Sequence, residues 1–192
     1  MNTRTAIGAL ALTCCLGLAG SASAQLLTED FEGSFPPTGW TLYQTGDPTD
    51  PGWVQTDLQA NSGTYSAYHN DDDLAAAAIS WIVTPQIALP ATPDSHLHFW
   101  QYENWYSYYD YHGIWVSTGS CDPNDGAFSE LVDLGVGVED TWVQVDQSLA
   151  TFAGQTICIA FRYEGDFADE WYIDDVEIND VVPVELQAFT IE

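Results

Sequence analysis

The segment WYIDDVEI, residues 171–178, decides the fold expected for this chain. Apolar Val176 and Ile178 alternate here with acidic residues. Side chains of a β-strand point to opposite faces at every second residue. The segment therefore predicts a strand with one apolar face and one acidic face.

A second acidic segment, Glu29 to Glu32, lies towards the other end of the chain. It also alternates, so we expect Phe31 on one face of a strand and Asp30 on the other. If the first and last strands pair, their carboxylates converge. Carboxylates close together repel unless they are protonated or bridged by a metal, and an oxygen-only cluster favours Ca²⁺. The two segments together predict a calcium site.

Residues 1–24 have the features of a secretory signal peptide. Arg4 supplies the positive charge, residues 6–19 are mainly apolar, and Ala22-Ser23-Ala24 fits a small-residue cleavage site. We expect cleavage before Gln25 and an exported protein that is secreted or extracellular, and associated with a cell surface if it is retained there.

The rest of the chain is expected to form one domain over residues 25–180, followed by a tail over residues 181–192. That length is sufficient for a single domain with a substantial core. No later apolar run approaches the ~18 residues of a membrane-spanning helix, so we predict no transmembrane span.

The chain is strongly acidic, with 29 Asp and Glu against 2 Lys and Arg. Arg4 falls in the predicted signal peptide, which leaves Arg162 as the single basic residue of the mature chain. Such a charge excludes nucleic acid and anionic membrane as partners. A solvated surface explains most of the acidity, because a calcium site uses only a handful of carboxylates.

Two of the 4 cysteines, Cys121 and Cys158, lie outside the predicted signal peptide. Exported proteins usually pair such residues, so we predict a disulfide between them. Neither has a second cysteine at metal-ligand spacing, which argues against zinc binding.

Runs of β-branched and aromatic residues recur along the chain without amphipathic helices between them. Strands are expected at 79–84, where Pro85 ends the run, and at 96–100, 113–117, 142–145 and 156–163. This pattern predicts an all-β fold, an antiparallel β-sandwich of jelly-roll type. The side chains assigned to the core include Trp81, Leu97, Phe99, Trp142, Phe161 and Ile178.

Five segments, taken together, resemble the bacterial cleaved-adhesin domains, also called choice-of-anchor J domains, which are similar to MAM domains. They are EDFEGSFPPTGW (29–40), WIVTPQIALP (81–90), HLHFWQYEN (96–104), GIWVSTG (113–119) and FRYEGDFADEWYIDDVEI (161–178). The resemblance implies a jelly-roll adhesion or ligand-binding module, often stabilised by calcium. It links Glu32, Asp174 and Asp175 to the metal, with Asp71 as a further loop candidate.

The densest aromatic segment runs from Trp100 to His112. Within it, Trp105, Tyr106, Tyr108 and Tyr109 are expected to form a ligand surface on a loop that crosses the end of a sheet. Such rings stack on sugars or anchor a protein partner. The alternative is that the rings pack on one another over an open sheet face.

Two functions therefore stay open. The first is a noncatalytic adhesion or glycan-binding module for an extracellular glycan or a surface or matrix protein. The second is a structural or accessory domain of a surface assembly, without a small ligand of its own. Glycan-binding and matrix-protein assays separate them.

Catalytic motifs do not accompany this pattern. The sequence has no G-x-S-x-G, no H-E-x-x-H and no phosphate loop, so we expect no enzyme. His96 and His98 are two residues apart and share a strand face, as a zinc pair does. A third ligand cannot be identified from the sequence, and an exposed polar face is the simpler interpretation.

Overall fold

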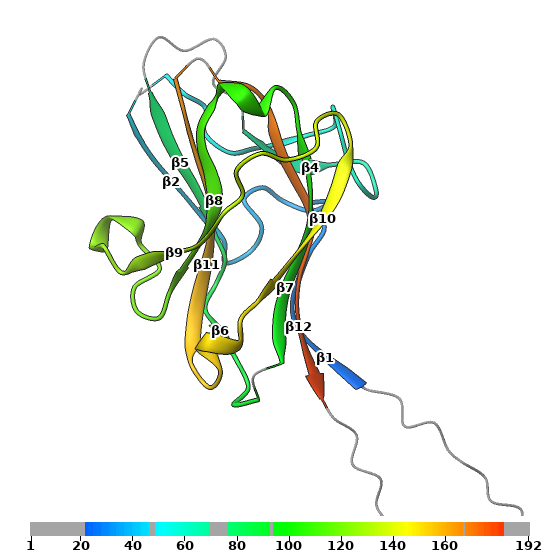
Figure 1. Cartoon of the computed structure of the whole chain (residues 1–192), viewed down its shortest axis with the longest axis vertical. Coiled ribbons are helices and arrows are strands. Elements are labelled where there is room, and N and C mark those ends of the chain that lie inside the picture. The colour runs from blue at the N-terminus through cyan, green and yellow to red at the C-terminus, as the bar shows by residue number, and fades with distance from the viewer. Residues whose placement is uncertain (1–21, 47–48, 70–76, 93, 167, 183–192) are drawn as a thin grey trace, which may run out of the picture.

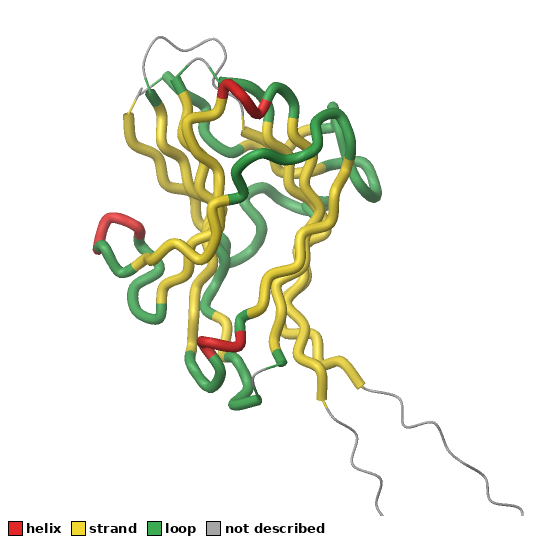
Figure 2. The backbone as a smooth tube through the Cα atoms, in the orientation of Figure 1, coloured by secondary structure: helices red, strands yellow, loops and turns green. Residues whose placement is uncertain are grey.

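The computed structural model describes residues 22–46, 49–69, 77–92, 94–166 and 168–182. These residues form two antiparallel sheets packed face to face as a β-sandwich, and only short 3₁₀ turns interrupt the strands and loops (Figures 1 and 2). The predicted all-β jelly-roll class is confirmed.

Each sheet contains strands from distant parts of the chain. Sheet A has the order β10 (Trp142–Ser148), β7 (Ser95–Glu103), β12 (Trp171–Val182), β4 (Ser66–His69) and β3 (Val54–Thr56), and β1 (Ala22–Glu29) also pairs with β12. Sheet B has the order β2 (Thr41–Gly46), β5 (Ala78–Val83), β11 (Thr156–Gly165), β8 (Tyr109–Ser117) and β9 (Phe128–Asp133), and β6 (Ile87–Ala88) pairs with β11. The 3₁₀ turns are η1 (Tyr106–Tyr108), η2 (Pro123–Asp125) and η3 (Ala150–Phe152).

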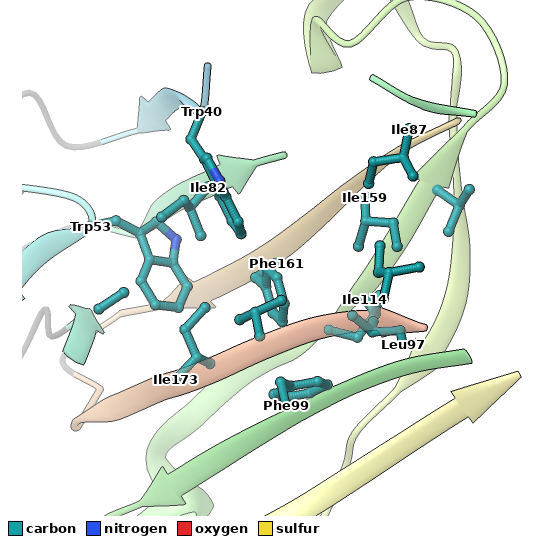
Figure 3. Close-up of a cluster of buried hydrophobic side chains, with 14 of the residues drawn as sticks. Trp40, Trp53, Ile82, Ile87, Leu97, Phe99, Ile114, Ile159, Phe161 and Ile173 are labelled. Atoms are coloured by element: carbon teal, nitrogen blue, oxygen red, sulfur yellow. The ribbon is translucent and has the colours of Figure 1, made fainter. Parts of the chain in front are cut away.

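Strand β7 shows how alternation builds the core. Leu97 and Phe99 are fully buried, whereas the residues between them are only half-buried. Figure 3 shows both side chains in the apolar layer between the sheets, with Phe161 of β11. Phe99 and Phe161 meet edge to face with ring centroids 5.0 Å apart, a favourable aromatic geometry.

Strand β12 lies at the centre of sheet A. It pairs with β7 on one side and with β4 and then β1 on the other, so the first and last strands are neighbours, which is the condition on which the predicted calcium site depended. A β-bulge interrupts its register between Asp174 and Glu177, where Asp175 has a left-handed backbone with φ 46°. The predicted simple alternation is therefore broken at the two aspartates.

The expected strand over Glu29–Glu32 is wrong beyond its first residue. Strand β1 ends at Glu29, and Phe31 turns the chain with φ 54°. The Phe31 ring enters the core, 1% exposed and 5.8 Å from the Trp40 ring. Burial of this ring at a turn explains the departure from strand geometry.

Two tryptophans assigned to the core, Trp81 and Trp142, instead lie half-buried on the outer faces of the sheets. Trp81 contacts Trp115, with centroids 5.4 Å apart, and the Arg162 guanidinium lies 5.3 Å from its ring. Alternation identifies two faces of a strand but does not say which one is inside, and this ambiguity caused the error.

The predicted domain boundaries fall near the ends of the described fold. The last three residues of the predicted signal peptide begin β1, and residues 1–21 and 183–192 lie outside the described residues. Across the described ranges, no helix is long and apolar enough to span a membrane. The start of β1 and the end of β12 lie together, at the opposite end of the sandwich from η1 (Figure 1).

Candidate functional site

Two loops cross from one sheet to the other at the end of the sandwich that carries η1 (Figure 1). One connects β7 to β8, and the other connects β9 to β10. Asp140 joins them: its backbone N–H donates to the Glu103 carbonyl at 2.9 Å, and its Oδ1 accepts from Asn104 Nδ2 at 2.8 Å. These bonds hold the two loops in a fixed relation.

A buried polar cluster of Glu103, Gln101 and His112 lies at the base of the β7–β8 loop. Glu103 is 1% exposed, and its Oε1 accepts a hydrogen bond from Gln101 Nε2 at 2.8 Å. His112 Nε2 lies 2.8 Å from the same oxygen. Because these bonds join β7 to β8 across the two sheets, they fix the strand ends from which the loop projects.

Trp105 and Tyr108 present their rings to solvent on the first loop. They are 55% and 54% exposed, and their ring centroids lie 6.1 Å apart. Trp105 has a left-handed backbone, φ 50°, which is unusual for a bulky residue and stores strain. Its carbonyl accepts from Tyr108 N–H at 2.9 Å. The backbone thus holds both rings outwards.

An open pocket of about 380 Å³ is lined by residues next to Trp105 and Tyr108 in the sequence, though not by these two residues themselves. Tyr106, Ser107, Asp110 and Tyr111 contribute from the first loop and β8, and Asp133 and Val136 contribute from the end of β9 and the second loop. Its wall therefore combines aromatic rings with hydroxyls and carboxylates.

Tyr109 differs from the other three predicted ligand residues. It is the first residue of β8, and its ring packs against Tyr163 and His112 with centroids 5.2 and 5.0 Å apart. Its hydroxyl donates to the Glu170 carbonyl, and burial raises the pKa of this phenol far above its usual value. The structure brings Trp105, Tyr106 and Tyr108 together at the loop and uses Tyr109 as packing in the pocket wall.

Two of the predicted metal residues, Asp174 and Asp175, lie at the bulge near the start of β12, and Glu32 lies just after β1. Strand β4 pairs with β12 up to Ile173, and β1 pairs from Val176 onwards. The gap between them is filled by a loop at Asn61 and Ser62, whose backbone N–H groups donate to Asp174 Oδ2 at 2.8 and 3.2 Å. The bulge thus turns a buried carboxylate towards this loop.

Asp175 and Glu32 hold the same loop. Asp175 accepts from Asn61 Nδ2 and Ser62 Oγ, each at 2.7 Å. Glu32 Oε1 accepts from the backbone N–H groups of Thr64 and Tyr65, each at 2.6 Å. All three carboxylates therefore converge on one short segment, residues 61–65.

Gly63 is required within that segment. It has φ 60°, and a Cβ there would lie 2.4 Å from Glu32 Oε1. Only glycine allows the carboxylate to approach so closely.

The loop site gathers three carboxylates, although their ligand atoms do not all lie within 4.8 Å of one another in the described structure. Burial raises the pKa of Asp174 to about 6 against the lowering effect of its backbone donors. Carboxylate oxygens are ligands that suit Ca²⁺, but here those of Asp174, Asp175 and Glu32 accept hydrogen bonds from N–H and O–H groups of residues 61–65. Asp71, the fourth predicted ligand, lies outside the described residues.

A row of aromatic side chains crosses the outer face of sheet A, and the sequence did not predict it as a whole. Trp142, Tyr102, Tyr172 and Tyr68 occupy matched positions on β10, β7, β12 and β4. The centroids are 5.8 Å apart for Trp142 and Tyr102, 5.6 Å for Tyr102 and Tyr172, and 4.7 Å for Tyr172 and Tyr68. We call this set the sheet-face row.

A buried Asp50, His69 and Ser80 group has the residue types of a hydrolase triad without its geometry. Ser80 Oγ donates to Asp50 Oδ2 at 3.0 Å, and His69 Nε2 lies 3.4 Å from that same oxygen. In a triad the serine bonds the histidine. Burial alone would raise the Asp50 pKa, yet hydrogen bonds from His69, Gly52 and Ser80 outweigh it and hold the pKa below its usual value.

The two cysteines are joined. Cys121 and Cys158 form a disulfide with Cα atoms 5.6 Å apart, a usual separation for such bonds. It ties the segment after β8 to β11, on the outer side of sheet B.

Comparison with known proteins agrees with this architecture. The chain is 30% identical over 155 residues to the pre-pro-metalloprotease PrtV of Vibrio cholerae; the match covers 72% of this chain but only 16% of that protein. No family model matches.

Among solved structures, the K3 cleaved adhesin domain of Lys-gingipain from Porphyromonas gingivalis superposes with a TM-score of 0.61 at 22% identity, covering 82% of this chain and 99% of that domain. A carbohydrate-binding module, TmCBM61, solved with β-1,4-galactotriose, gives a TM-score of 0.52 at 19% identity, covering 78% of this chain and 92% of that one. The chain therefore has an adhesin-like jelly-roll fold.

Proposed function

We propose that this chain is a noncatalytic, extracellular ligand-binding module, secreted or held at a cell surface, that binds glycans through the loop at Trp105, Tyr106 and Tyr108. The observation that carries the proposal is the pair of solvent-exposed rings on a loop whose residues Tyr106 and Ser107 line an open pocket of about 380 Å³. The placement of these loops at the opposite end of the sandwich from β1's start and β12's end supports it, because those strand ends do not cover the loops (Figure 1).

The chemistry of the loop suits a sugar. The apolar faces of Trp105 and Tyr108 match the C–H faces of a pyranose ring, while the pocket wall supplies hydrogen-bonding groups such as Ser107 and Asp110. Acidic and hydroxyl groups accept and donate to sugar hydroxyls. A neutral glycan fits this surface better than an anionic one, because the chain has a formal charge of −27.

Calcium binding by Glu32, Asp174 and Asp175 is part of the proposal. A Ca²⁺ ion at the loop over residues 61–65 would neutralise carboxylates that have no Lys or Arg partner among the ion pairs of the described residues. Its role would be to stabilise the bulge in β12 and not to take part in a reaction.

The test is calorimetric titration of the whole chain with β-1,4-galactotriose, xylo-oligosaccharides and a broad panel of neutral glycans. Trp105→Ala and Tyr108→Ala should each remove binding to any glycan identified, while the melting temperature stays within about 2 °C because exposed side chains contribute little to stability. Tyr65→Ala removes a ring that is 37% exposed from a different loop and serves as the control.

Two results would oppose the proposal. Normal binding by Trp105→Ala and Tyr108→Ala would move the ligand site elsewhere. Absence of binding to every glycan, with capture of matrix proteins or of nothing, would favour the protein-binding or accessory role instead.

A further inference from the structure

The outer face of sheet A also carries a histidine pair that the loop surface does not involve. His96 and His98 project from β7 on the side opposite to the buried Leu97 and Phe99. Their side chains are 38% and 28% exposed, and their rings are nearly parallel, with centroids 5.8 Å apart. The strand thus presents two imidazoles side by side to solvent.

The neighbouring strand supplies a third group. In the register of β10 and β7, Asp146 stands directly opposite His98. Asp146 Oδ1 lies 2.6 Å from His96 Nδ1 and 3.8 Å from His98 Nδ1. One ligand atom from each of the three residues can be chosen so that all lie within 4.8 Å of one another. Among the described residues, this is the one such group of three His, Cys, Asp or Glu side chains.

We propose that His96, His98 and Asp146 bind a divalent transition metal ion of the zinc type. Zinc bonds to nitrogen and oxygen are about 2.0–2.2 Å long, so tetrahedral ligand atoms lie about 3.3 Å apart. The two distances from Asp146 Oδ1, 2.6 and 3.8 Å, lie below and above this spacing. Small side-chain rotations on an exposed face bring the ligand atoms to it. Three protein ligands leave one position for water or for a ligand atom.

The donor set separates this site from the calcium site. Two imidazole nitrogens and one carboxylate favour Zn²⁺, Cu²⁺ or Ni²⁺ over Ca²⁺ and Mg²⁺. The surroundings favour a cation as well: Glu177 of β12 stands opposite His98 on its other side, and Arg162 lies on β11 in sheet B. The register of sheet A therefore flanks His98 with a carboxylate-bearing residue on each neighbouring strand.

The experiment uses the whole chain, freed of metal with a chelator and titrated calorimetrically with ZnCl₂ alone. We expect one equivalent of Zn²⁺, unaffected by excess calcium. Loss of an outer-shell partner lowers metal affinity by about 10–100-fold. His98→Gln and Asp146→Asn each remove a direct ligand, so each should weaken Zn²⁺ binding by more than that. Asp57→Asn, which removes an exposed carboxylate from the loop after β3, gives the same change in charge and should bind Zn²⁺ normally.

Histidine NMR spectra provide a second readout that needs no substitution in the site. The chain has 4 histidines, and two of them, His69 and His112, are buried. Zn²⁺ should shift the imidazole signals of the exposed pair and leave the buried pair unchanged. Equal Zn²⁺ affinity in all three variants, or unshifted signals of the exposed pair at saturating Zn²⁺, would overturn the proposal.

Discussion

The loop surface at Trp105 and Tyr108 and the sheet-face row are both aromatic, but their rings are used differently. In the row, each ring contacts another on the next strand, and Tyr172 at its centre is only 3% exposed. On the loop, the two rings are more than half exposed and are held out by a left-handed backbone at Trp105. Rings that cover a sheet stabilise it, whereas rings held apart from the sheet remain free to bind.

Replacing Tyr172 by alanine is the strongest way to test this contrast. Loss of a buried aromatic side chain should destabilise the fold by about 3–5 kcal/mol. For a domain of this size the melting temperature should fall by about 6–20 °C. Thermal melts followed by circular dichroism measure the change, with Tyr108→Ala as the exposed counterpart. A melting temperature for Tyr172→Ala equal to that of Tyr108→Ala would contradict the assignment of the row to packing.

Calcium should stabilise the fold through sheet A, which carries the sheet-face row, and should leave glycan binding at the loop surface unchanged. The reason is that Asp174 and Asp175 lie on the bulge that follows Tyr172 in β12. At a hundredfold excess over Kd, binding to the folded state adds about 2.7 kcal/mol. The melting temperature should rise by about 5–10 °C in calcium relative to EDTA.

Ionic strength must be matched in those melts, because a formal charge of −27 responds to any salt. Asp175→Ala or Glu32→Ala should abolish most of the calcium shift. Coincident melting curves in calcium and in EDTA would contradict calcium binding at this loop.

Tyr109→Phe marks the boundary between packing and binding within the aromatic segment. The substitution removes the hydroxyl that donates to the Glu170 carbonyl and keeps the ring. The hydroxyl also accepts from the Asn104 N–H at 3.3 Å, but that N–H keeps the Glu170 carbonyl as an acceptor at 3.0 Å. Loss of the Tyr109 hydroxyl should therefore reduce stability by about 1 kcal/mol, or about 2–4 °C in melting temperature. Glycan affinity should not change, since the hydroxyl points into the fold. A binding loss without a stability loss would place Tyr109 in the ligand surface.

The smallest predicted effect is a loss of stability at acidic pH that depends on Asp50 and involves neither aromatic surface. The folded-state pKa of Asp50 lies below its ordinary value of 3.8, so its ionised form contributes stability above that pH. This contribution is lost as the pH falls from about 4 through the folded-state pKa. The melting temperatures of Asp50→Asn and the unmodified chain should therefore converge as the pH is lowered from 7 to 3. A constant difference would mean that Asp50 does not titrate in this way.

Much of the fold follows from local sequence patterns. The alternation around Leu97 and Phe99 predicted both the strand and its buried side, because polar His96 and His98 alternate with them. The first and last strands do pair, but through residues 22–29, of which only Glu29 belongs to the acidic segment that suggested a first strand. The Trp142 error has the opposite cause: its strand has large apolar residues on both faces, since the row covers the outer one.

The site residues were predictable only where neighbours in sequence are also neighbours in space. Trp105 and Tyr108 are three residues apart and meet across one 3₁₀ turn. Asp146, by contrast, reaches His96 only through the register of two strands separated by a long connection, which no local pattern contains. The contacts of Asn61 and Ser62 with Asp174 and Asp175 depend on the bulge in β12, which no local pattern contains either.

The most direct test follows the indole N–H signals of the 8 tryptophans by NMR while a glycan identified by calorimetry is titrated into the whole chain. Trp105→Phe and Trp142→Phe assign the two relevant signals by their disappearance. If the loop surface binds the ligand, the Trp105 signal moves in a saturable way and the Trp142 signal stays in place. Movement of Trp142 with a stationary Trp105 would place the ligand on the sheet face and contradict the account.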